Sequence, residues 1–160
     1  MKKILMTLVL ALAMVQGASA QFEQGKKYVG ASLTGLNLSF SDLKDLSLGV
    51  DANAGYFVER DIMLVGNVGL DFSNGDLNQL VVGAKGRYYI EQNGIFLAAG
   101  VKFRHLLSSV NDVQVTPEVG YCYFLNHYIT VEPSVYFDMS LTDFSHNSEF
   151  GFKCGIGIYF

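Results

Sequence analysis

Residues 128–139 read YITVEPSVYFDM, and apolar and polar side chains alternate along this stretch. One set holds Ile129, Val131, Pro133, Val135, Phe137 and Met139, and the other holds Thr130, Glu132, Ser134, Tyr136 and Asp138. Successive side chains of a β-strand point to opposite faces of its sheet. Alternation with this period therefore predicts a strand with one apolar and one polar face.

The same pattern recurs in residues 113–123 (VQVTPEVGYCY) and residues 149–160 (EFGFKCGIGIYF). Weaker alternation toward the N-terminus predicts further strands near residues 28–39, 46–57, 62–72, 79–90 and 95–104, which brings the expected number to eight. The first of these changes phase around Gly35, which indicates a bulge or a kink at that point.

The segments between the expected strands alternate in length. Tight turns are expected at Val58–Asp61, Glu91–Gly94 and Leu125–His127, where Asn93-Gly94 is a strong hairpin signal. Longer polar segments lie between them, at Phe40–Asp45, Ser73–Asn78, His105–Asp112 and Ser140–Ser148. Short turns at one end and longer loops at the other are typical of outer-membrane barrels, whose tilted strands of roughly 9–11 residues cross the hydrocarbon layer. The sequence predicts an all-β fold, an eight-stranded antiparallel up-and-down transmembrane β-barrel.

The first twenty residues have the features of an export signal. Lys2 and Lys3 form a basic start, an apolar stretch without charges follows, and Ala18 and Ala20 supply the small residues of a cleavage site before Gln21. We therefore expect residues 1–20 to be a signal peptide and residues 21–160 to be one outer-membrane β-barrel domain, exported to the bacterial outer membrane.

The net charge and the hydropathy of the chain narrow the class of protein further. Removing Lys2 and Lys3 from the eleven basic residues leaves nine against fifteen acidic ones, a net charge of −6, so nothing favours nucleic acid as a partner. The mean hydropathy is positive, yet no apolar run after residue 20 is long enough for a spanning helix. A barrel with an apolar outer face accounts for both observations, because a closed sheet satisfies its backbone groups in lipid.

Aromatic residues gather where the expected strands end, as two bands that would mark the membrane interfaces. Near the short turns lie Tyr28, Tyr56, Phe57, Tyr88, Tyr89, Tyr123, Phe124, Tyr128 and Phe160, and toward the longer segments lie Phe40, Phe72, Phe103, Phe137 and Phe150. A soluble barrel would carry charged residues at most outer positions, whereas here the polar face is sparse and rich in glycine.

Charges of both signs occupy this polar face, which we expect to line the lumen. Unpaired charges in a narrow lumen would be very costly, so opposite signs should pair there. The expected luminal charge network comprises Asp51, Lys85, Arg87, Lys102, Glu118, Glu132, Asp138 and Lys153, with Asp71 and Arg104 on the same face.

The prolines and cysteines test the strand register. Pro117 and Pro133 lack the N–H that a closed barrel needs, and a turn centred near Asn126 would place them almost opposite each other. A bulge or a slackened ladder is therefore expected there.

Cys122 should face the lumen and Cys154 the lipid, from strands that are not neighbours. No disulfide is therefore expected between them.

The C-terminal strand carries the most specific motif. Lys153 is followed by Gly155, Ile158 and the terminal Phe160, the spacing of a polar residue, a glycine and two hydrophobic residues with which outer-membrane barrels typically end. With the signal peptide and the hairpin rhythm, the chain resembles the outer membrane protein beta-barrel domain family, the OmpA- and OmpX-like eight-stranded barrels. The resemblance implies that the barrel assembly machinery reads this segment as an assembly signal. Because the last expected strand ends at Phe160, we expect no cell-wall-binding domain.

Catalytic and metal sites are not indicated. Some eight-stranded barrels modify lipid A, but His146-Asn147-Ser148 lies in a loop beside Glu149, and His105 is wrongly spaced from Ser108 or Ser109 to act with Glu118. The three histidines, His105, His127 and His146, do not cluster as metal ligands would. No cofactor motif is present, and we expect no cofactor.

The sequence therefore favours a non-enzymatic, monomeric barrel in contact with outer-membrane lipids. Its role would be envelope integrity, or an adhesion-like surface contact through loops around Asp42, Asp45, Asp76, Asp112 and Asp143. A small-molecule, porin-like channel is the main alternative and a lipid A-modifying enzyme a weaker one, because an eight-stranded barrel is just wide enough for its own side chains.

The terminal motif generates a first prediction. Deleting Phe160 should leave refolding in detergent nearly normal, because one exposed ring contributes only part of a full burial energy of roughly 1.5–3 kcal/mol. The same deletion should block insertion in cells and leave unfolded chain in the periplasm. Equal defects in cells and in detergent would instead make Phe160 a structural residue only.

Overall fold

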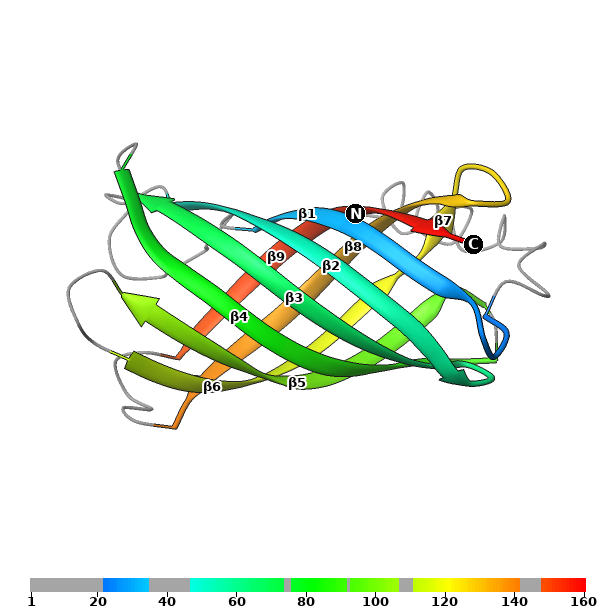
Figure 1. The fold of residues 1–160 in the computed structure, drawn as a ribbon, viewed down its shortest axis with the longest axis horizontal. Helices are drawn as coiled ribbons and strands as arrows, with labels where there is room; N and C mark the ends of the chain where they lie inside the picture. The colour runs from blue at the N-terminus through cyan, green and yellow to red at the C-terminus, as the bar shows by residue number, and fades with distance from the viewer. Residues whose placement is uncertain (1–21, 35–46, 74–75, 92, 107–110, 142–147) are drawn as a thin grey trace, which may run out of the picture.

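The protein is described from a computed structural model that covers residues 22–34, 47–73, 76–91, 93–106, 111–141 and 148–160. Antiparallel strands wrap around a single elongated lumen (Figure 1). The strands are β1 (Lys27–Thr34), β2 (Ser47–Glu59), β3 (Ile62–Ser73), β4 (Asp76–Tyr89), β5 (Ile95–Leu106), β6 (Asn111–Tyr121), β7 (Tyr123–Phe124), β8 (Ile129–Ser140) and β9 (Glu149–Tyr159).

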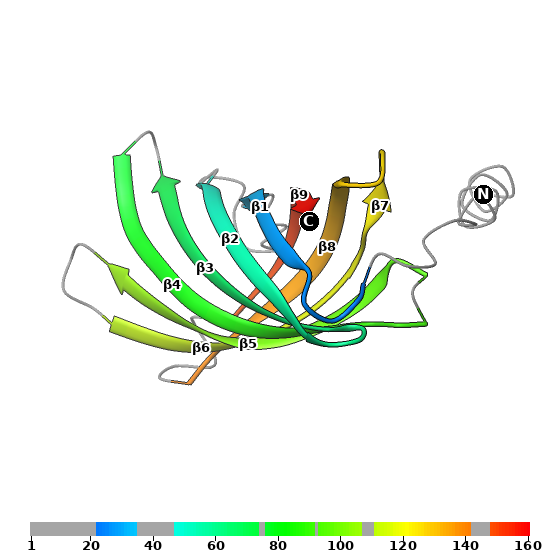
Figure 2. The same ribbon diagram turned by 45° about the vertical axis from the view of Figure 1, so that its right-hand side comes forward.

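The sheet closes on itself. Strands β1 to β6 pair in chain order, and both β6 and β7 pair with β8. β8 pairs with β9, and β9 returns to β1, which lies between β2 and β9 (Figure 2). β6 and β7 are one barrel strand interrupted at Cys122, so the labelled strands form an eight-stranded barrel. The predicted fold class is confirmed. The described residues include no helix long and apolar enough to cross a membrane.

The expected strands agree with the observed ones to within a few residues. The tight turns also lie where expected, and at two of them Asp61 and Glu91 adopt positive φ. Part of the first expected strand, with the phase change at Gly35, lies outside the described residues, as do Phe40–Asp45 and residues 142–147.

One of the longer segments was predicted wrongly, and a second is shorter than expected. Instead of a loop at Ser73–Asn78, Ser73 pairs with Asp76 and Phe72 with Leu77, and a register shift follows before Gln79. The intervening residues are Asn74-Gly75, a hairpin dipeptide that the prediction overlooked. His105–Asp112 also shortens, because ladder pairing continues as far as His105 and Asn111.

Both prolines act on one seam of the barrel, between β6–β7 and β8. The register is the same on either side of two gaps in this ladder, one at Thr116–Pro117 and one at Tyr121–Cys122. Leu141 N–H donates to the Val113 carbonyl in that register, so the hydrogen-bonded pairs fall on odd-numbered residues.

Each proline therefore stands at a position where any other residue would donate its N–H across this seam. Pro117 would stand opposite Phe137 and Pro133 opposite Tyr121 in the same register. The expectation that the two prolines lie almost opposite each other was wrong, because the turn is centred one residue later. Of the two expected alternatives, a bulge and a slackened ladder, the structure has the slackened ladder.

The two faces of the barrel differ as the alternation requires. Val101, Ile156 and Leu33 are more than half exposed, whereas Glu118 and Glu132 on the inner face are almost fully buried. Cys122 is buried and Cys154 exposed, and both thiols are free. Val135 and Ile158 are likewise exposed, and Ile129 and Val131 are half-buried.

Close approach of β4 to β5 explains one inward glycine. A Cβ placed on Gly100 would overlap the Ala84 carbonyl and lie 2.6 Å from the Lys85 Cα, both backbone atoms that cannot turn aside. On the outer face, a Cβ on Gly86 would meet no atom within 4 Å. The two positions form a matched pair.

We predict that Gly100→Ala destabilises the barrel by about 1–3 kcal/mol, the usual cost of overpacking. Gly86→Ala should be neutral or stabilising by roughly 0.5 kcal/mol, because glycine weakens a strand interior. The chain has no tryptophan, so the folded fraction in urea is followed by the gel mobility of unheated samples. Equal stability of the two variants would contradict the close packing of β4 on β5.

Candidate functional site

The barrel interior is the candidate site, and an aromatic cluster closes its short-turn end. Phe22, which precedes β1, is fully buried and stacks on Tyr89 with ring centroids 3.9 Å apart. Its ring also lies 6.0 Å from Phe57, 5.6 Å from Phe124 and 5.9 Å from Tyr159. Rings from four separate strands thus meet around one side chain.

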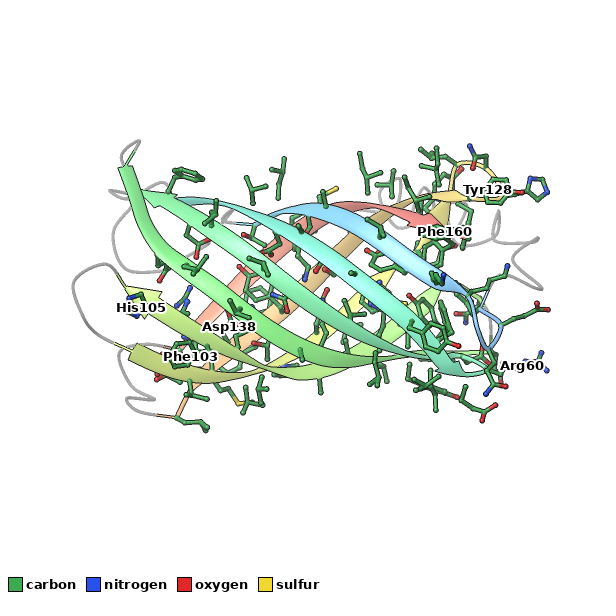
Figure 3. All side chains as sticks on the ribbon, viewed as in Figure 1. Arg60, Phe103, His105, Tyr128, Asp138 and Phe160 are labelled. Carbon is green, nitrogen blue, oxygen red and sulfur yellow. The ribbon has the colours of Figure 1, made fainter. Side chains whose placement is uncertain are left out.

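This cluster corrects the predicted aromatic band. Tyr28, Phe57 and Tyr89 point into the lumen, whereas Tyr56, Tyr88, Tyr123, Tyr128 and Phe160 are exposed outside. Part of the band points inward because several of its aromatics are adjacent in the sequence, as in Tyr56-Phe57, and consecutive strand residues face opposite sides of the sheet. Tyr128 and Phe160 lie at the short-turn end, and Phe103 and His105 at the loop end (Figure 3).

Above the rings, Glu132 and Arg87 form a buried ion pair of 2.8 Å, with both side chains 3% exposed. Tyr28 and Tyr159 donate hydroxyl hydrogen bonds of 3.0 Å and 2.8 Å to the Glu132 carboxylate, and Thr130 donates another of 2.9 Å. The Arg87 guanidinium lies 4.1 Å from the centroid of the Phe96 ring. This carboxylate is satisfied on both oxygens, as a buried charge requires.

The next level is centred on Glu118. Its carboxylate accepts from Lys85 Nζ at 2.6 Å and from Lys153 Nζ at 2.8 Å, and Ser134 donates to the same group at 2.8 Å. The three charged residues come from β4, β6 and β9, so they connect separate walls of the barrel. Two small polar cavities flank this triad, and all three residues line both of them.

Toward the loop end, Lys102 Nζ lies 2.9 Å and 3.0 Å from the two Asp138 oxygens, and Thr116 also donates to Asp138. The Tyr136 ring lies beside this level, 4.7 Å from Lys102 Nζ. Asp138 lies inside the barrel (Figure 3). Near the mouth, Arg104 approaches Asp71 at 4.0 Å.

Seven of the eight residues predicted for the luminal charge network are thus brought together in ion pairs, namely Lys85, Arg87, Lys102, Glu118, Glu132, Asp138 and Lys153. Asp51 is not, since no cation in the described ranges comes within 4.0 Å of it. It lines one cavity with Lys102 and Lys153 instead. Whether the network has a role beyond packing stays a prediction.

Sequence reasoning missed Phe22 and the tyrosine partners of Glu132. Tyr159 could have been found, because it falls on the polar phase of the last strand. Phe22 gives no such signal, because it precedes every alternating stretch. Asp112 was also misplaced: it is not a surface loop residue but is buried on β6, accepting from Gln114 and Ser140.

The residues of the terminal motif divide between the faces, Lys153 and Gly155 inward and Ile158 and Phe160 outward. Ala18, Ala20 and Gln21 lie outside the described residues, as do Ser108, Ser109 and His146. His105 is exposed on the outer face whereas Glu118 is buried inside, so these two do not converge. Among the residues that the structure describes, no group of three His, Cys, Asp or Glu could hold a metal ion.

Comparison with known proteins bears on the fold. No family model and no curated protein matches the chain. The N-terminal β-barrel domain of Pseudomonas aeruginosa OprF is similar in structure, with a TM-score of 0.68 and 14% identity over 86% of this chain and 98% of that one. The chain has the fold of an outer-membrane β-barrel.

Two further solved structures share this barrel fold. The outer membrane protein OprG from Pseudomonas aeruginosa has a TM-score of 0.54 and 12% identity over 86% of this chain and 97% of its own. A de novo designed transmembrane β-barrel has a TM-score of 0.56 and 17% identity over 86% and 98%. At such identities the likeness concerns the fold alone, and it is consistent with the OmpA-like barrels that the terminal strand resembles.

The buried ion pairs generate a stability prediction. Glu132→Ala should destabilise the barrel by up to about 3–5 kcal/mol, because it leaves Arg87 buried without its counter-charge. Asp51→Ala is the matched control, an inward carboxylate without an ion pair, and should cost at most about 1 kcal/mol. Urea unfolding in detergent compares the two, and an unchanged Glu132→Ala midpoint would refute the pairing.

Proposed function

We propose that the protein is a non-enzymatic structural barrel of the bacterial outer membrane with a closed lumen. The observation that carries this proposal is the filling of the lumen by side chains that bind one another. Arg87 and Glu132, and then Lys85, Glu118 and Lys153, bridge the walls at successive levels, below which the rings around Phe22 close the short-turn end.

The outer face supports the membrane setting. Exposed aliphatic side chains cover it between the exposed aromatics, and in water so large an apolar surface would promote association. Outer-membrane lipids are therefore the proposed partner of this face. A leader of residues 1–20 would deliver the chain, and Lys153, Gly155, Ile158 and Phe160 would present it to the assembly machinery. A closed ring has no free strand edge, which is compatible with a monomer.

The proposed role is envelope integrity or surface contact. Surface contact would rest on the segments that join strands at the end opposite the short turns, which contain Asp42, Asp45 and Asp143. Asp112 does not contribute, because it is bound inside the barrel. The test compares the detergent sensitivity of a strain that lacks the protein with that of the wild type. Increased sensitivity that a variant with exchanged loops restores to normal would favour envelope integrity over surface contact.

Conductance separates this proposal from the channel alternative. The wild-type barrel in planar bilayers should give no steady conductance above the lipid baseline, because an ion would have to break buried pairs such as Lys85–Glu118 in order to pass. Stable ohmic openings in preparations that show the folded gel mobility would instead make the protein a channel. A heat-unfolded sample of the same preparation serves as the control for contaminating porins.

A further inference from the structure

The short segment before β1 is bound across the short-turn mouth of the barrel. Asp61 N–H donates to the Phe22 carbonyl at 3.0 Å, and Gly25 N–H donates to the Phe57 carbonyl at 2.9 Å. Gln24 adds a side-chain hydrogen bond of 3.0 Å to the Val58 carbonyl. The segment is therefore held at the end of β2 and the turn after it, while its one large ring points inward.

We propose that residues 22–26 form a hinged plug, with Gly25 as the hinge and Phe22 as the stopper, that opens and closes this mouth of the lumen. The plug is a conformational device that the proposed function does not require. It governs access from the short-turn side to the buried side chains behind the Phe22 ring, among them Cys122.

Phe22 is the stopper because its ring fills the space between opposite walls. It contacts Phe57 on β2, Tyr89 on β4, Phe124 on β7 and Tyr159 on β9, and no part of its side chain is exposed. These strands lie around the whole circumference of the barrel. Withdrawal of this one ring would leave the middle of the mouth unfilled.

Gly25 is suited to be the hinge. Its φ of +89° lies in the region that glycine adopts without cost, and the nearest atom to an added Cβ would be the Tyr56 hydroxyl at 4.0 Å. The closed position therefore depends on backbone freedom at this residue rather than on tight packing around it. Release requires only the loss of a few hydrogen bonds and of the Phe22 ring contacts.

The chain carries its own reporter of plug opening. Cys122 is 2% exposed, and its sulfur lies 3.3 Å from the Tyr159 hydroxyl and 4.0 Å from the Tyr89 hydroxyl, on two of the rings that Phe22 covers. The buried Arg87–Glu132 pair lies on the other side of these rings from Phe22. A water-soluble reagent should therefore reach Cys122 only when the plug is open.

The test measures the rate at which a charged methanethiosulfonate modifies Cys122 in the folded barrel, with Cys154→Ala in every sample to remove the outer thiol. Wild-type Cys122 should react far more slowly than a free thiol. Phe22→Ala should raise the rate about 100-fold, since loss of a buried phenyl ring shifts a closed equilibrium by at least that factor. Gly25→Ala should raise it about tenfold, because the closed φ disfavours a side chain.

Tyr128→Ala is the matched control, since it removes an exposed ring from the same end and should leave the rate unchanged. If Phe22→Ala fails to fold, Gly25→Ala carries the test, because it removes no ring. Wild-type reactivity near that of a free thiol would overturn the proposal. So would unchanged rates in Phe22→Ala and Gly25→Ala, or an equal increase in Tyr128→Ala, which would indicate general loosening.

Discussion

Pairing of opposite charges across a narrow lumen is the constraint on which the rest of the structure depends. An apolar exterior leaves most polar strand residues on the inner face, where the narrow barrel has little room for water. Glu118 on β6 meets Lys85 on β4 and Lys153 on β9, and Glu132 on β8 meets Arg87 on β4. A slip of one residue on any of these strands would turn its charge into the lipid and leave its partner buried alone.

The same constraint acts on the seam that contains both prolines. Both prolines remove hydrogen bonds from the seam between β6–β7 and β8, yet the register continues unchanged through both gaps. Side chains add bonds across the same seam, since Thr116 at the first gap donates to Asp138, and Ser134 donates to Glu118 in the paired stretch between the two gaps. Side-chain bonds thus join the two strands at the first gap and in the stretch that follows it.

Much of this arrangement could be predicted because period-two alternation reports a residue's face directly. It placed the strands, the outward aliphatics and seven members of the charge network, since each depends only on position within a strand. Alternation failed for residues whose position depends on something other than their place within a strand. Phe22 lies before the first strand and reaches the lumen by a turn at Gly25, and the adjacent aromatics at Tyr56 and Phe57 look alike in composition although they point opposite ways. Asp51 faces inward as predicted, but the face alone does not determine a partner.

The most direct test of the central claim is a double-mutant cycle on Arg87 and Glu132, with each replaced by methionine singly and together. Unfolding in urea, followed by gel mobility, gives the free energy of each variant. Pairing in the lumen predicts a large loss in each single variant, and a double variant close to wild type, because apolar side chains of similar size can replace a buried ion pair. Losses that simply add would contradict the account, since the two charges would then not depend on each other.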